Sequence, residues 1–294
     1  MDQIMQQLIN GLSLGSIYAL VALGYTMVYG IIQLINFAHG DILMIGAYVG
    51  FFCTTNLHLG IPESLVIAMA TCALLGVIIE RVAYKPLRNS ARITMLITAI
   101  GVSIVLEYGM MYFMGASVRV YPPQPSYLTG SFTIGGVLVK NQQIFIVGIS
   151  VGLMILLQFI VHRTRVGKAM RAVSQDAEAA RLMGINVDNT VSLTFALGSA
   201  LAGAAGVLVA VYYNSINPLM GIDRGLKAFV AAVFGGIGLI PGALVGGFII
   251  GLLETLVTWA GGSMYREAVV YAVLILVLII KPTGLFGRNV KEKV

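Results

Sequence analysis

Charged residues are scarce in this chain. Of its 294 residues only 10% are Asp, Glu, Lys or Arg, 58% are hydrophobic, and the mean hydropathy is +0.93. A soluble domain carries about 25% charged residues, and a soluble domain with so few would expose large apolar patches. No polar stretch is long enough to build a separate soluble domain. We therefore expect one membrane domain over residues 1–294, with the lipid bilayer as its solvent.

The sequence also lacks the motifs of the common catalytic sites. The one Gly-Lys pair, Gly167-Lys168, is followed by alanine and has no upstream glycine spacing, so no ATP-binding P-loop is present. No HExxH or CxxC motif occurs, and Cys53 and Cys72 lie in apolar runs where a structural role is expected. These absences predict a protein that is not an enzyme and that holds no metal and no cofactor.

Long apolar runs predict an all-α, polytopic transmembrane helical bundle of about eight or nine segments. Such a helix needs about 20 mainly apolar residues. Seven runs satisfy this length, at roughly 8–31, 62–80, 93–114, 142–162, 190–213, 241–260 and 264–281. The segments 36–55 and 226–240 are less regular, and a broken or re-entrant piece is an alternative to a full crossing for either. An odd number of crossings is needed between 189 and 281, which favours 226–240 as a true, if short, crossing.

Lysine and arginine predict the orientation, because they concentrate in cytoplasmic loops. The segments 80–92, 162–189 and 281–294 together carry 13 of the 18 basic residues. The loop 115–141 carries only two and is expected to be external. This clustering in loops favours a membrane protein over one that binds nucleic acid.

Two further patterns concern local structure. Residues 131–140 are expected to form a β-hairpin with a turn at Gly135-Gly136. Each half of the chain also has an asparagine-containing break, LINFAHGD at 34–41 and SINPLMG at 215–221, which indicates a duplicated architecture. Small-residue pairs favour close helix packing, and Gly-x-x-x-Gly pairs occur at Gly11/Gly15, Gly242/Gly246 and Gly247/Gly251, among other places.

A few ionisable or strongly polar groups lie at membrane depth. An acidic group at the centre of a membrane helix costs roughly 2.5–3.5 kcal/mol to insert, so it should face protein or water. The candidates for lining a substrate pathway are Asn36, His39, Asp41, Glu107 and Glu254. The alternative for each carboxylate is a structural role with a satisfied partner.

The longest cytoplasmic polar segment, 163–188, is expected to couple the protein to a partner. It predicts a helix over 175–183, with Ser174 as the N-cap and Gly184 as the terminator. The small surface of this helix fits a groove on another protein. The candidate coupling residues are Ala177, Ala179, Ala180, Met183 and Gly184.

Several of these strings resemble one family. NGLSLGSIYAL at 10–20, GYTMVYG at 24–30, INFAHGD at 35–41 and AMRAVSQDAEAARLMGI at 169–185 are similar to the LivH-type permeases of bacterial branched-chain amino-acid importers, which are ATP-binding-cassette (ABC) transporters. The likeness covers essentially the whole chain.

The resemblance implies a function and a set of partners. It implies a multi-pass permease of the bacterial inner membrane that forms half of the pathway for leucine, isoleucine and valine. The implied partners are a second, different permease, two cytoplasmic ATP-binding subunits and a periplasmic substrate-binding protein. The alternatives are an ABC permease for urea, short amides or other amino acids, a stand-alone secondary transporter, or a channel.

Overall fold

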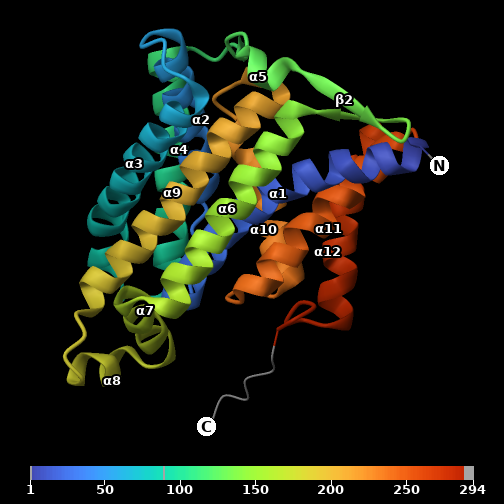
Figure 1. The fold of residues 1–294 in the computed structure, drawn as a ribbon. Helices are drawn as coiled ribbons and strands as arrows, with labels where there is room; N and C mark the ends of the chain where they lie inside the picture. The colour runs from blue at the N-terminus through green and yellow to red at the C-terminus, as the bar shows by residue number, and fades with distance from the viewer. Residues whose placement is uncertain (1, 89, 288–294) are drawn as a thin grey trace.

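Membrane-length helices account for most of the chain (Figure 1). The computed structural model describes residues 2–88 and 90–287. Within them, seven helical segments are long and apolar enough to cross a bilayer. They belong to α1 (Asp2–Ile32), α3 (Ile61–Ile79), α4 (Arg92–Met114), α6 (Asn141–Arg163), α9 (Val187–Tyr213), α11 (Ile240–Trp259) and α12 (Arg266–Ile280). This arrangement confirms the predicted all-α bundle.

Two shorter helices correspond to the irregular segments. They are α2 (His39–Thr55) and α10 (Met220–Gly235), of 17 and 16 residues. The prediction of 226–240 was wrong in its bounds, since α10 begins six residues earlier and ends at Gly235. Gly236 has φ +107° and stops the helix, whereas Pro241 lies in the first turn of α11, where proline is tolerated.

The expected β-hairpin is confirmed at one end of the bundle. Strands β2 (Ser131–Ile134) and β3 (Val137–Lys140) pair antiparallel, and Gly135 and Gly136 have φ +57° and +84°, as a two-residue hairpin turn needs. The side chain of Gln6 exchanges two 2.9 Å hydrogen bonds with the backbone of Leu138. Helix α1 therefore begins at this hairpin end.

The opposite end carries α7 (Arg165–Gln175) and α8 (Ala177–Leu182), as Figure 1 shows. Helix α3 runs into a π-helical turn (Glu80–Tyr84) and a 3-10 turn (Lys85–Leu87). At the hairpin end, β1 (Arg119–Val120) pairs with β4 (Ser215–Ile216), near the short α5 (Ser126–Thr129). Arg288, Lys291 and Lys293 of the predicted cytoplasmic tail lie outside the described residues.

The helices α1–α3 and α9–α11 form two similar sets that run in opposite directions. The first helix of each set packs along the third helix of the other set, α1 on α11 and α9 on α3. The middle helices, α2 and α10, each pack on the third helix of their own set and on the first helix of the other set. The turns before the short helices also match, because His39 N–H donates to Asn36 and Met220 N–H donates to Asn217, at 3.1 and 3.2 Å. The two asparagine-containing breaks thus occupy equivalent positions, in line with the predicted duplication.

Glycines bring α1 and α11 into close contact. A Cβ atom added at Gly247 would lie 2.3 Å from Cα of Ala19, and one at Gly251 would lie 2.3 Å from Cα of Gly15. Atoms at such distances overlap, so any side chain there would push the helices apart. The expectation of close packing at the Gly-x-x-x-Gly pairs is confirmed here.

The two ends of the bundle should differ in accessibility from outside the cell. Tyr127 at the hairpin end is 50% exposed and Leu182 in α8 is 88% exposed, while both native cysteines are buried. We expect Tyr127→Cys to react with a membrane-impermeant maleimide on intact cells, and Leu182→Cys to react only after permeabilisation. The reverse pattern would overturn the orientation taken from the basic loops.

Candidate functional site

The starts of α2 and α10 meet inside the bundle. A Cβ atom at Gly40 would lie 2.4 Å from the carbonyl oxygen of Gly221, and one at Gly225 would lie 2.7 Å from Cα of Gly40. Only glycine allows the two backbones to approach this closely. Neither short helix has the length of about 20 residues that a full crossing requires. Both therefore begin within the bundle rather than at its surface.

A pair of buried carboxylates lies beside this junction. Asp41 and Glu107 are 2% and 7% exposed, and the Ser103 hydroxyl lies 2.5 Å from Asp41 Oδ2 and 3.4 Å from Glu107 Oε1. Asp41 is in the first turn of α2, whereas Ser103 and Glu107 are one turn apart on α4. Two elements distant in the sequence thus bring the predicted Asp41 and Glu107 together.

These carboxylates line a cavity of about 280 Å³. Its walls come from α1, the segment before α2, α2, α4 and α10, and include the aromatic rings of Tyr25, Phe37 and Phe229. A water molecule occupies about 30 Å³, so the cavity has room for a small organic molecule. A cavity with apolar and aromatic walls and two acidic groups can bind a cation that carries an apolar side chain.

Asn36 and His39 lie outside the lining of this cavity. The Asn36 side-chain oxygen accepts a 2.8 Å hydrogen bond from the Tyr84 hydroxyl. The ring of His39 is fully buried, 4.6 Å from the ring of Tyr25, and fills the space over Gly24. Both side chains therefore contact helices that pack around the segment leading into α2, and the pathway role expected for them stays a prediction.

Glu254 belongs to a separate buried network. Its Oε1 lies 2.8 Å from Lys227 Nζ, and its Oε2 accepts a 2.7 Å hydrogen bond from Tyr18. Lys227 and Glu254 are 1% and 3% exposed, and Lys227 Nζ is also 3.4 Å from Glu267 Oε1. Glu254 therefore has the satisfied structural partner that was the alternative to a pathway role.

Among the polar residues that the sequence reasoning missed are the half-buried Ser103 and the buried Lys227 and Glu80. The signal for Lys227 was its place in the apolar string GLKAFVAAVFG. The ion-pair partner of Lys227 cannot be predicted from sequence spacing, because Glu254 lies 27 residues further along the chain. Glu80 was assigned to a polar loop, whereas α3 continues through it in a π-helical turn.

The predicted coupling segment forms two helices rather than one. The expected helix 175–183 is α8, which covers only Ala177–Leu182, and Ser174 is inside α7, where its hydroxyl donates to Arg171. The N-cap is Asp176, whose carboxylate accepts from two backbone N–H groups at 2.9 Å. Ser174 was the wrong choice because α7 continues through it and the chain becomes extended only at Asp176.

The end of α8 follows the prediction. Gly184 has φ +85°. Its N–H donates to the Arg181 carbonyl, and that of Ile185 donates to the Ala180 carbonyl, both at 3.0 Å. This pair of hydrogen bonds is a Schellman motif, in which glycine is the favoured residue.

The alanine surface of α8 is divided between two environments. Ala180 is 4% exposed and packs inward, while Ala177 and Ala179 are exposed. The most exposed apolar side chains at this helix and its C-cap are Leu182 and Met183, at 88% and 83%. The surface available to a partner is therefore formed by the C-terminal end of α8 more than by an alanine face.

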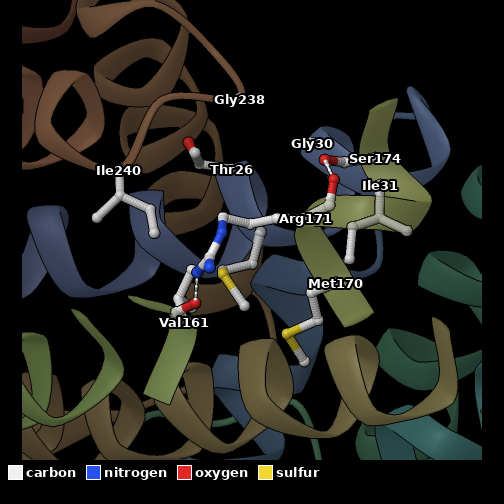
Figure 2. Close-up of a pocket in the computed structure, with 10 residues that line it drawn as sticks. Thr26, Gly30, Ile31, Val161, Met170, Arg171, Ser174, Gly238 and Ile240 are labelled. Carbon is white, nitrogen blue, oxygen red and sulfur yellow. Dashed lines mark hydrogen bonds between the residues drawn. The ribbon is translucent and has the colours of Figure 1, made fainter. Parts of the chain in front are cut away.

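Helix α7 closes a small cavity against α1 (Figure 2). The cavity measures about 100 Å³ and lies between Gly30, Gly238 and the α7 residues Arg171 and Ser174. The Arg171 guanidinium donates to the carbonyl of Val161 near the end of α6. The coupling segment is thus anchored to two membrane helices.

Comparison with known proteins gives a consistent result over the length of the chain. The family described as "Branched-chain amino acid transport system / permease component" matches residues 7–278. The high-affinity branched-chain amino acid transport system permease protein BraD of Pseudomonas aeruginosa is 43% identical, over 99% of this chain and 98% of the relative. The corresponding LivH of Escherichia coli is also 43% identical, over 99% and 97%. The ribose import permease protein RbsC of Escherichia coli is 28% identical, over 93% and 84%.

The buried Lys227–Glu254 pair should control stability. Removing one partner of a buried ion pair costs up to about 3–5 kcal/mol, because the other charge loses its nearest compensation. The more distant Glu267, 3.4 Å from Lys227, and Arg266, 3.7 Å from Glu254, replace it only in part. We expect Lys227→Met and Glu254→Leu each to lower the thermal midpoint in detergent strongly, and the double variant to recover much of that loss. Lys85→Met is the control, since its ion pair with Asp188 is nearly half exposed on both sides and such pairs contribute about 0–1 kcal/mol. Equal losses in all variants would contradict this assignment.

Proposed function

This chain belongs to the permease component family of branched-chain amino acid transport systems, and we propose that it forms half of the pathway that carries leucine, isoleucine and valine across the bacterial inner membrane. As a member of that family it is a multi-pass membrane protein and a transport subunit rather than an enzyme. In this proposal the whole chain is a single permease domain that works within an ABC importer.

The Asp41–Glu107 cavity is the observation that carries the proposal. A branched-chain amino acid has an ammonium group and a compact apolar side chain. The two carboxylates offer acceptors for the ammonium group, and Phe37 and Phe229 offer apolar walls. Among the described residues neither carboxylate has a lysine or arginine within ion-pair distance. Intramembrane acids without such a partner favour a site for a cationic group or for water.

The opening of the cavity supports a second permease as partner. It lies between α4 and α10, where Ile100, Ile104, Ile222 and Leu226 are between 37% and 48% exposed. Lipid in front of two carboxylates would leave them without a polar environment. A second permease on this face would enclose the cavity and complete the pathway. The resemblance to LivH-type permeases implies a second, different permease, so a heterodimer is the form that we propose.

The other partners follow from what the chain lacks. The described residues 2–88 and 90–287 include no P-loop, so the proposal assigns ATP hydrolysis to two cytoplasmic subunits that contact α8. It assigns substrate delivery to a periplasmic binding protein that docks at the hairpin end. The segments concerned are the coupling segment 163–188 and the external loop 115–141.

The alternatives are distinguishable. RbsC, at 28% identity, is named as a ribose permease, so related permeases serve other small polar molecules, and urea, short amides or other amino acids remain alternative substrates. A secondary transporter or a channel would move substrate without ATP. Uptake that depends on added ATP separates these classes, and competition by leucine, isoleucine and valine separates the substrates.

The carboxylate of Asp41 should matter for transport. Asp41→Asn keeps the size of the side chain but removes its charge. A charged hydrogen bond contributes about 1.5–3 kcal/mol, so we expect leucine uptake by the reconstituted complex to fall about 10- to 100-fold, with normal assembly. Glu63→Gln, which changes an exposed acid near the start of α3, is the control. Normal uptake by Asp41→Asn would remove this cavity from the pathway.

The end of α8 should transmit the signal from the ATPases. A β-branched residue at Gly184 is strained at φ +85°, so Gly184→Val should displace Leu182 and Met183. We expect substrate-stimulated ATP hydrolysis to fall by an order of magnitude, about 1.4 kcal/mol, while membrane insertion is retained. Gly115→Val is a matched control, because Gly115 has φ +79° and open space around it but lies at the hairpin end. Equal effects of the two changes would show that strain alone, and not coupling, is responsible.

A further inference from the structure

A second cavity lies at the α8 end of the bundle, away from Asp41. It measures about 200 Å³ and is lined by eight apolar side chains and by Glu80, Tyr84 and Arg88. The apolar residues come from α1, α4, α7, α8 and α9. Arg88 is 26% exposed, and its partner Asp188 is 45% exposed, so the polar wall lies toward solvent at this end. The proposed pathway does not account for this cavity.

The polar wall carries both signs of charge. Glu80 is fully buried; its Oε1 lies 2.7 Å from Arg88 Nη2, and its Oε2 accepts a 2.6 Å hydrogen bond from Ser192. Arg88 also contacts Asp188 at 2.7 Å. A guanidinium has five N–H donors and a carboxylate has about four acceptor sites, so both groups can bind a further partner. An acyl chain or a detergent tail would use only the apolar walls.

These walls complement a small amino acid with an apolar side chain. Its carboxylate can accept from Arg88, its ammonium group can donate to Glu80, and its side chain can lie among residues such as Met95, Val191 and Phe195. Charge-assisted hydrogen bonds to both ends fix the orientation of such a ligand. A sugar or an uncharged amide satisfies only part of this arrangement.

The cavity is lined both by the coupling segment 163–188 and by Tyr84, which supports the break before α2. Val173 in α7 and Ala177 in α8 form one side of it. Tyr84 forms another side, and its hydroxyl holds Asn36 at the start of the helix break. A ligand in this cavity therefore contacts the coupling segment and the support of the break together.

We propose that this cavity binds, from the cytoplasmic side, the amino acid that the importer has delivered, and that the bound amino acid slows further transport. The identity of the ligand rests on the proposed function. The physical requirement is that the ligand binds one conformation more tightly than the other. A ligand that bridges α7, α8 and Tyr84 favours the conformation in which these elements are packed together, as they are in this structure.

Reconstituted vesicles test this proposal with the complete importer. ATP is enclosed in the lumen, and leucine-loaded binding protein is supplied outside, so only complexes with the cytoplasmic side inward are active. The rate of ATP hydrolysis is measured with and without leucine in the lumen. At about ten times its dissociation constant, luminal leucine should leave roughly one-tenth of the activity. Activity that is unchanged by luminal leucine up to saturating concentrations would overturn the inference.

Leucine analogues test the polar wall without any change in the protein. Leucinamide lacks the carboxylate, and 4-methylpentanoate lacks the ammonium group. We expect each analogue to inhibit at least about tenfold more weakly than leucine, because each has lost the group that makes one charged hydrogen bond. Equal inhibition by leucine and both analogues would mean that the polar wall does not recognise the ligand.

Two variants on adjacent residues locate the effect. Met95→Trp places a larger ring in the cavity, whereas Leu96, on the next residue of α4, is 38% exposed and does not line it. We expect Met95→Trp to abolish inhibition by luminal leucine, while ATP hydrolysis without luminal leucine is kept. Leu96→Trp should be inhibited by luminal leucine to the same extent as the unmodified protein. Inhibition that persists in Met95→Trp would locate the effect elsewhere. A copurifying phospholipid that Met95→Trp loses, with inhibition intact, would identify a lipid site and overturn the proposal.

The same vesicles separate this inference from the proposed function. Absence of leucine uptake into vesicles whose lumen holds ATP but no leucine would overturn both. Normal uptake into such vesicles, with no effect of added luminal leucine, would overturn only the cytoplasmic site.

Discussion

The contact between Gly40 and Gly221 is the constraint on which the arrangement of the bundle depends. Because α2 and α10 both begin there, the free N–H groups of two first turns lie inside the protein, and each helix start carries a partial positive charge. In a bilayer such groups need polar partners or water. Asp41 and Asp223 stand in the two first turns, where the helix dipole favours a carboxylate. A larger residue at either glycine would separate the two starts and remove this polar centre.

Charge compensation distinguishes the structural carboxylates from the others. Glu254 is held by Lys227 and Tyr18, and Glu80 is held by Arg88 and Ser192. Each of these acids ties together helices that are distant in the sequence, and a buried pair is costly to break. The Asp41–Glu107 pair has only the Ser103 hydroxyl between its members. The same residue type therefore serves packing where a cation faces it, and the pair without a cation among the described residues is the one that we propose for ligand binding.

The parts of this fold that follow from local chemistry were predictable from the sequence. The long helices follow from apolar runs, the hairpin from its paired glycines, and the end of α8 from Gly184. The pairing of Glu254 with Lys227 was not predictable, because it is set by the packing of α10 against α11. The cap of α8 was assigned two residues too early for a local reason. Both Ser174 and Asp176 are good N-caps, and only the extended backbone at Asp176, with φ −157°, selects between them.

In the proposed importer, the short connection between α1 and α2 is the route by which work done at α8 reaches the polar centre. Helix α1 ends at Ile32, and six residues lead from there to His39. Helix α7 packs against the last turn of α1 at Gly30 (Figure 2), and the Tyr84–Asn36 hydrogen bond holds the connection itself. Because packed helices move as stiff units, a shift of α7 acts on the last turn of α1 and on the connection that follows it. Asp41 is the third residue of α2, so the path from the end of α1 to the polar centre is short.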